Sequence, residues 1–123
     1  MSQDQTRERR QHIRIIADVR CWLERESITL LGTATNMSTA GLFLRTPVPV
    51  AAGSRVSLRI DVEGGIVLVQ GYVVWTVTSK ENKRYSGLGI CFDKIIDGEN
   101  LLEKFVEQNK PGRSETNQPR IRT

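Results

Sequence analysis

The chain has 123 residues, 38% hydrophobic and 26% charged, a composition typical of one compact globular domain. No apolar run approaches the roughly 20 residues that span a bilayer, and the first residues are polar, so we expect a cytoplasmic protein with neither a transmembrane span nor a secretory signal. The net charge of +4 divides into +2 over residues 1–14, +3 over residues 110–123 and −1 between them, and this nearly neutral body argues against extended binding to nucleic acid.

The first half of the chain alternates between apolar and polar residues with the period of β-strands. Residues 15–23 show this most clearly, because every second side chain is apolar. A polar hairpin turn follows, and after the second strand residues 36–41 form a tight polar connection into the third. Pro47 ends the third strand because it has no backbone donor. The strands predicted in this half cover residues 15–23, 28–35, 42–46 and 56–62.

The second half predicts two more strands and then a change of period. After a glycine turn at residues 63–65, the strands cover residues 66–78 and 85–92, joined by a polar loop at 80–84. A helix then begins near Asp97 or Gly98, with Asp97 as its N-cap. Four apolar residues share one face of this helix: Leu101, Leu102, Phe105 and Val106. Apolar residues nearly vanish after Asn109, which predicts a disordered tail.

Six antiparallel strands followed by one amphipathic helix indicate a mostly β fold. We expect a six-stranded antiparallel β-barrel with the C-terminal helix packed over an opening or an edge. The folded domain would cover residues 9–108, with a flexible arm at 1–8 and a disordered tail at 109–123.

The side chains inside this barrel can also be predicted. Cys21 and Cys91 fall within strands, and we expect them to be small core residues rather than a disulfide or a metal pair. Most of the seven aromatic residues also occupy positions that we expect to face inward.

Two polar strings carry the functional signal. The first contains Arg10 and Arg14, and the second contains Asn36, Ser38 and Gly41. Guanidinium groups make forked hydrogen bonds to phosphate and to guanine edges, and they stack on bases. A glycine lets the backbone approach a ligand closely. Together these residues suit an anionic, purine-containing small molecule.

The order and spacing Arg10-x-x-x-Arg14 followed by Asn36-x-Ser38-x-x-Gly41 resembles the PilZ domain family. Members of that family carry an RxxxR motif followed by (D/N)xSxxG, and the pair binds the bacterial second messenger cyclic di-GMP. The strings at residues 71–75 and 87–92 resemble weaker signatures of the family. The resemblance therefore covers residues 9 to about 107 and implies the same barrel.

The resemblance also implies a role for each motif residue. Arg10 and Arg14 would contact phosphate and guanine, and Asn36 would contact a guanine edge. Ser38, which we expect with Asn36 in an exposed connection, would donate to a phosphate, and Gly41 would leave room for the ligand. Alternatively, the Asn36 and Ser38 side chains cap their own turn, and both roles are compatible.

An arginine directly before the RxxxR motif, here Arg9, is associated in the family with two stacked copies of the ligand. The bound form would therefore contain one or two copies of cyclic di-GMP. Residues 1–14, the arginine arm, contain no apolar residue between Met1 and Ile13. We expect this arm to be mobile without ligand and to become ordered when ligand binds.

Enzymatic functions find little support in the sequence. It has no P-loop, no nucleophile elbow and no Cys/His pair with metal spacing, and its one histidine, His12, has no catalytic partner nearby in sequence. We therefore predict a binding protein without catalytic, metal-binding or cofactor residues, whose ligand is cyclic di-GMP.

Two alternatives remain open. A small nucleic-acid-binding barrel would need aromatic side chains gathered on one sheet face. A PilZ-like adaptor that has lost its ligand would act through protein contacts alone. For a PilZ receptor with no second domain, we expect an unknown downstream protein to carry the output, in motility, pili or surface polysaccharide.

Overall fold

The computed structural model describes residues 13–78 and 86–111. The predicted loop at 80–84, residues 1–12 of the arginine arm and the predicted tail from residue 112 lie outside these ranges. Within them, six strands are followed by a helix, in the predicted order. The elements are β1 (Ile15–Arg25), β2 (Ile28–Met37), β3 (Gly41–Thr46), β4 (Arg55–Val62), β5 (Gly65–Thr78), β6 (Ser86–Asp97) and α2 (Glu99–Asn109).

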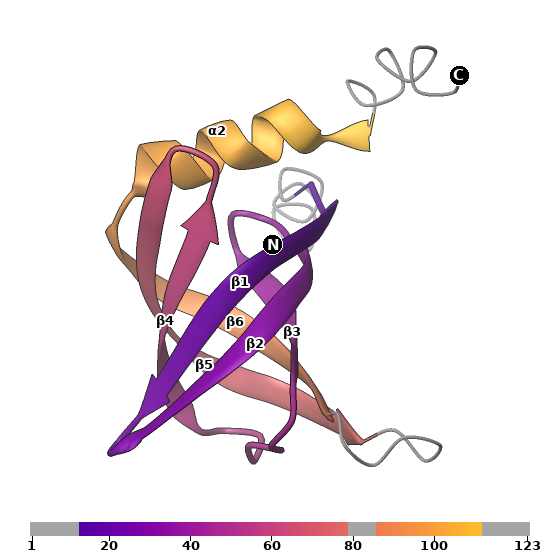
Figure 1. Ribbon diagram of the computed structural model, residues 1–123, viewed down its shortest axis with the longest axis vertical. Coiled ribbons are helices and arrows are strands. Elements are labelled where there is room, and N and C mark those ends of the chain that lie inside the picture. The colour runs from indigo at the N-terminus through magenta and orange to yellow at the C-terminus, as the bar shows by residue number, and fades with distance from the viewer. Residues whose placement is uncertain (1–12, 79–85, 112–123) are drawn as a thin grey trace, which may run out of the picture.

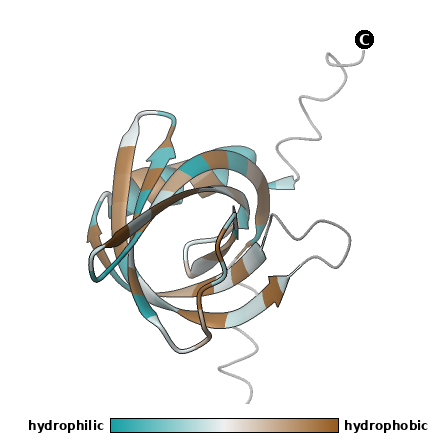
Figure 2. Cartoon of the chain, turned by 60° about the horizontal axis from the view of Figure 1, so that its bottom comes forward, coloured by the Kyte–Doolittle hydropathy of each residue, from teal (hydrophilic) through white to brown (hydrophobic). Residues whose placement is uncertain are grey.

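The six strands form a closed antiparallel barrel in the order β1-β2-β3-β6-β5-β4, and the pairing of β1 with β4 closes it (Figure 1). Figure 2 shows the ring of strands, with hydrophobic and hydrophilic residues alternating along them. Closure pairs every strand on both sides, so the sheet has no free edge. The predicted barrel is confirmed.

Alternation along the strands divides core from surface. On β1, Cys21 and Leu23 are fully buried, whereas Arg20 and Glu24 are exposed. Burial, reinforced by the Asp61 carboxylate, raises the pKa of Cys21 to about 12, so its thiol stays protonated and acts as a small core group. The same prediction is wrong for Cys91, whose side chain is only half-buried.

Helix α2 lies across one end of the barrel (Figure 1). Its predicted apolar face is confirmed, because Leu102 and Val106 are buried and Leu101 and Phe105 pack against the core. No helix in the described part of the chain is long and apolar enough to cross a membrane.

The predicted N-cap of the helix is wrong. Asp97 is the last residue of β6, where it pairs with Leu68, so it is held in the sheet. The cap is Gly98, with φ of 89° and no side-chain capping bond. This left-handed conformation allows the chain to turn sharply from strand to helix, and glycine adopts it without steric cost.

The last strand is longer than predicted, because it runs past Phe92 to Asp97. The adjacent polar residues Asp93 and Lys94 break the alternation there, which is why the pattern indicated an end. In the structure β6 continues, and its register against β5 shifts between Gln70 and Gly71. Such bulges keep a strand paired while interrupting its alternation.

Candidate ligand-binding site

The two polar strings meet at the start of β1. Ile16 pairs with Asn36 near the end of β2, and Arg14 immediately precedes β1. The Nη1 atom of Arg14 donates to Oδ1 of Asn36 at 2.7 Å, which joins residues that are 22 apart in sequence. The structure thus brings together one arginine of the first string and the amide of the second. Arg9 and Arg10 lie outside the described residues.

Asn36 belongs to a row of residues that crosses five strands on the outside of the barrel. Asn36 pairs with Phe43 on β3, Phe43 with Gly89 on β6, and Gly89 with Trp75 on β5. Ile16, the partner of Asn36 on β1, is the other end of the row and is 87% exposed. We call these five residues the site row.

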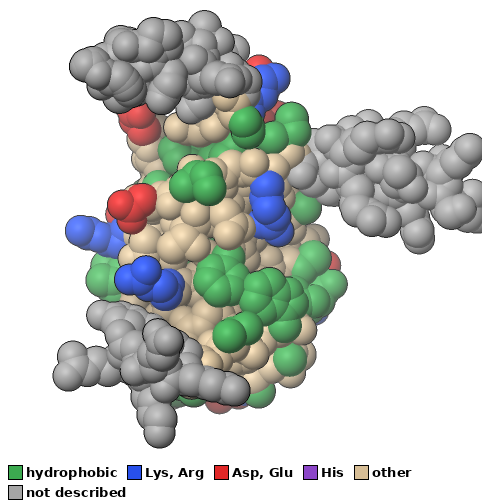
Figure 3. Space-filling model, turned by 90° about the vertical axis from the view of Figure 1, so that its right-hand side faces the viewer, with side chains coloured by type: hydrophobic (Ala, Val, Ile, Leu, Met, Phe, Trp, Pro, Cys, Tyr) green, Lys and Arg blue, Asp and Glu red, His purple; other side chains and the backbone are tan. Residues whose placement is uncertain are grey.

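A hollow of about 580 Å³, within the range of small-molecule sites, opens over the site row except at Ile16. Besides residues of the row, its lining includes Arg14, Ser38, Gly41, Val74 and Cys91. Among the residues that the structure describes, Arg14 is the one charged side chain in the lining. Figure 3, which views the right-hand side of Figure 1, shows hydrophobic side chains gathered on one face with Lys and Arg side chains close to them.

Two aromatic side chains form an apolar wall of the hollow. The ring centroids of Phe43 and Trp75 lie 5.2 Å apart, and Trp75 is 48% exposed. Gly87 and Gly89 lie against these rings, because a Cβ atom at Gly87 would collide with Phe43 and one at Gly89 with Trp75. The two glycines of β6 therefore provide the flat surface on which the rings rest.

This wall corrects the prediction that most aromatic residues face inward. No aromatic side chain among the described residues belongs to the fully buried core. The sequence pattern did not identify Phe43 and Trp75 as residues of the candidate site. The available signal was the Gly87-x-Gly89 pair, whose bare positions leave space for large rings on neighbouring strands.

Ser38 is not exposed as predicted, since its exposed fraction is 3%. Its Oγ atom accepts a hydrogen bond from the backbone N–H of Ala40 at 3.0 Å, and its own N–H donates to the carbonyl of Gly41 at 2.9 Å. The self-capping alternative therefore describes this turn. The hydroxyl proton has no acceptor among the described residues, so Ser38 can still donate into the hollow.

Gly41 has a structural reason to be glycine. It pairs with Cys91 on β6, and a Cβ atom at Gly41 would collide with the backbone oxygen of Ile90. Its φ angle lies outside the left-handed region, so space rather than backbone conformation excludes a side chain. The close approach of β3 and β6 thus requires the motif glycine even without a ligand.

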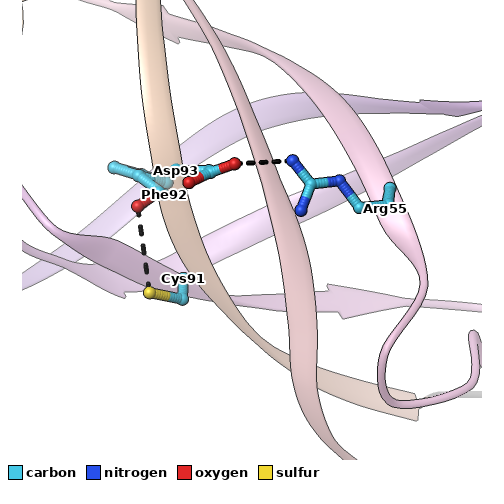
Figure 4. A network of polar contacts seen from close by, with 4 residues as sticks. All are labelled: Arg55, Cys91, Phe92 and Asp93. Atoms are coloured by element: carbon cyan, nitrogen blue, oxygen red, sulfur yellow. Dashed lines mark hydrogen bonds and ion pairs between the residues drawn. The ribbon is translucent and has the colours of Figure 1, made fainter.

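A polar cluster continues from Gly41 around the barrel. Arg55 on β4 forms an ion pair with Asp93 on β6 at 2.5 Å, across the strand between them (Figure 4). The Arg55 guanidinium carbon lies 5.9 Å from the ring centroid of Tyr72, and a hydrogen bond with Cys91 raises the pKa of Tyr72. Asp93 neutralises the charge of Arg55. This cluster therefore attracts an anion less strongly than Arg14 does.

The arrangement is suited to binding a small molecule. A guanidinium, an amide and a hydroxyl donor surround a hollow with two aromatic rings on one wall. These groups can hold a flat, anionic molecule by charge-assisted hydrogen bonds and stacking. In the described ranges, no group of three His, Cys, Asp or Glu side chains could hold a metal ion.

A family model described as the PilZ domain matches residues 8–108, a range that includes both motifs and all six strands. The chain belongs to the PilZ domain family. The match includes Arg9 and Arg10 as well as every residue of the site row. Among curated proteins, none is significantly similar to this PilZ domain in sequence.

Three solved structures share the fold. The PilZ domain of Escherichia coli YcgR with c-di-GMP has a TM-score of 0.60 at 13% identity, covering 94% of this chain and 99% of that one. The Bacillus subtilis inhibitor of motility MotI/DgrA has a TM-score of 0.67 at 13% identity, covering 92% and 53%. The K. pneumoniae MrkH–c-di-GMP complex has a TM-score of 0.62 at 15% identity, covering 89% and 52%. The chain thus spans about half the length of the last two proteins.

Proposed function

We propose that this PilZ domain is a cyclic di-GMP receptor that couples the messenger to a partner protein through ordering of its arginine arm. The observation that carries the proposal is the hydrogen bond between Arg14 and Asn36 beside the hollow. It joins the two halves of the paired motif at a site with room for a small molecule. Two similar structures, YcgR and MrkH, contain c-di-GMP, which supports the same ligand class here.

Among the described motif residues, the three polar ones each have a donor for this ligand. Cyclic di-GMP presents two phosphates and two guanines. The fork of Arg14 can bind a phosphate or the O6 and N7 atoms of guanine. Because Oδ1 of Asn36 already accepts from Arg14, its amide protons remain for a guanine edge. The Ser38 hydroxyl donates to a phosphate, and the faces of Trp75 and Phe43 contact a base.

Ligand binding would convert this site into a signal through the arginine arm. Arg14 is already placed by Asn36, so part of the site exists before the ligand arrives. The phosphates then attract Arg9 and Arg10, which tethers the arm to the turn at residues 38–41. An ordered basic arm beside a bound nucleotide is a new surface that a downstream protein can recognise. Arg9 would decide whether one or two ligand copies bind.

The nucleic-acid alternative has one observation in its favour, the exposed aromatic pair Phe43 and Trp75. A single-strand binder also needs a basic groove that follows the backbone, whereas the described residues lining the hollow include one cation, Arg14. Calorimetric titration with cyclic di-GMP, beside a short single-stranded oligonucleotide, tests the proposal. We expect saturable heat with cyclic di-GMP and none with the oligonucleotide. Heat with the oligonucleotide alone would favour the nucleic-acid alternative, and none with either would favour the adaptor.

Alanine substitutions of the two polar residues of the second motif should differ in their effects on binding and on stability. We expect Asn36→Ala to weaken cyclic di-GMP binding several-fold without lowering the melting temperature, because Asn36 lies on the outer surface. Ser38→Ala should weaken binding and also lower the free energy of unfolding by about 1 kcal/mol, since the buried turn loses its cap. Calorimetry and thermal melting measure both effects. Unchanged affinity in both variants would leave this string a structural role only.

Trp75 should report ligand binding by its own fluorescence. Its indole is 48% exposed at the hollow, whereas Trp22 lies elsewhere on the barrel. We expect cyclic di-GMP to change the emission of the wild-type protein and of Trp22→Phe, but not of Trp75→Phe. Trp75→Ala should lose about 1–3 kcal/mol of binding free energy, the range for base–aromatic stacking. A signal that persists in Trp75→Phe would place the ligand away from this wall.

A further inference from the structure

A second row of residues crosses the outside of the barrel, away from the site row. Leu31 on β2 pairs with Trp22 on β1, Trp22 with Arg59 on β4, and Arg59 with Leu68 on β5. Facing residues of neighbouring strands have their side chains on the same face, about 5 Å apart. Cys21 and Leu23 point into the core, so Trp22 and the residues paired with it point outward.

The second row forms the centre of an exposed apolar patch. The exposed fractions are 44% for Leu31, 36% for Leu68, 47% for Ile66 and 48% for Ile96. Ile66 shares the outward face of Leu68 two residues along β5, and the exposed Ile96 is the extra residue of β6 at the register shift between Leu68 and Val69. We call this surface the lateral patch; its residues are Trp22, Leu31, Arg59, Ile66, Leu68 and Ile96. Contiguous apolar side chains on a small domain indicate an interaction surface, unlike single exposed ones.

The lateral patch is separate from the proposed ligand site. The two share no residue, and on β5 the patch residue Leu68 lies seven positions from Trp75, roughly 20 Å along the strand. Because the barrel is closed, a partner cannot bind by adding a strand to an edge. Binding here must use side-chain packing around the patch.

The charges in and around the patch indicate which kind of partner it binds. Arg59, at the centre, makes no ion pair or hydrogen bond among the described residues. Asp61 lies two residues along the same strand, and Asp97 faces Leu68. On β1, Arg20 lies two residues before Trp22 and Glu24 two residues after it, and both are exposed. The patch and its immediate surroundings therefore carry charges of both signs, and none of these charged side chains forms an ion pair within the described residues.

We propose that the lateral patch is the two-fold interface between two copies of this chain. In a two-fold dimer the same surface meets itself, so a patch of one charge sign would repel its copy. This patch instead offers the carboxylates of one copy to Arg59 of the other while its apolar side chains pack together. A hollow of about 660 Å³ lined partly by Leu31, Arg20 and Asp61 adjoins the patch and leaves room for side chains of the second copy.

Such a dimer would hold two ligand sites at a distance from its interface, which leaves both free to bind. A partner that contacts both sites would gain avidity without any new contact on either one. This inference does not depend on which ligand the hollow over the site row binds.

Sedimentation equilibrium of the full chain, from micromolar to millimolar concentration, tests the interface. We expect the wild-type mass to rise toward twice that of the monomer. Leu68→Arg should weaken association at least tenfold, because the two-fold axis places the added cations near each other. The matched control is Val77→Arg, on the same strand and 51% exposed but outside the patch, and it should associate like the wild type.

Thermal melting should show that both variants remain folded, since each replaced side chain is on the surface. A wild-type protein that stays monomeric at every concentration would overturn the proposal. The patch would then be a binding surface for a different protein. Equal association of Leu68→Arg and the wild type would also overturn it. Calorimetry with cyclic di-GMP is a separate readout, so a failed dimer and a failed ligand assignment can be distinguished.

Discussion

Arg14→Ala and Arg10→Ala should each remove most of the affinity for cyclic di-GMP. A charge-assisted, forked contact contributes about 1.5–3 kcal/mol, so its loss weakens binding by more than tenfold. Arg14 suits this test because its side chain is exposed and its one hydrogen bond in the described structure is to Asn36. We therefore expect a loss of binding without a loss of stability, measured by calorimetry and by thermal melting of the same samples.

Arg113→Ala is the control for the arginine variants. Arg113 carries the same charge but belongs to neither motif. The Arg113→Ala variant should therefore bind the ligand as the wild type does. If all three variants weaken binding equally, the attraction is diffuse charge and the assignment of Arg10 and Arg14 is wrong. Raising the salt concentration adds a check, because screening weakens diffuse attraction more than a close, forked contact.

Gly41→Ala should destabilise the fold, whatever its effect on binding. The added Cβ atom meets the backbone oxygen of Ile90, and backbone on a paired strand cannot move aside as a flexible side chain can. Overpacking of this kind costs about 1–3 kcal/mol. For a domain of this size that corresponds to a fall in melting temperature of roughly 4–8 °C for each kcal/mol. Thermal unfolding followed by circular dichroism measures the shift.

Thr39→Ala is the control for Gly41→Ala, because Thr39 lies in the same connection and makes no hydrogen bond in the described structure. Its melting temperature should stay close to that of the wild type. If Gly41→Ala melts like the wild type and yet loses cyclic di-GMP, the glycine serves the ligand and the packing explanation fails.

Strand periodicity predicted the six strands, because inward and outward side chains alternate wherever the pairing between strands is regular. It failed where the ladder is irregular. Asp93 and Lys94 interrupt the alternation of β6 beside a register shift against β5, so the strand looked shorter than it is. Asp97 looked like a helix cap because capping chemistry is local, whereas its pairing with Leu68 depends on a strand that is distant in sequence.

The candidate site was only partly predictable for the same reason. The paired motif identified Arg14 and Asn36, and their contact closes a gap of 22 residues. The wall formed by Phe43 and Trp75 depends on pairing among β3, β6 and β5, which the sequence pattern does not specify. The burial of Ser38 was missed because polarity suggested an exposed turn, whereas the structure satisfies the hydroxyl oxygen within that turn.

Amide hydrogen exchange of the whole chain, with and without saturating cyclic di-GMP, tests the proposed receptor most directly. The proposal predicts that ligand slows exchange at residues 9–14 and 36–41 together, and more weakly around Trp75 and Gly89. The lateral patch should show no change caused by the ligand. If the amides of these segments are already fully protected from exchange in the free protein, the result would contradict ligand-linked ordering of the arginine arm. Protection confined to other strands, or none at saturation, would contradict the site itself.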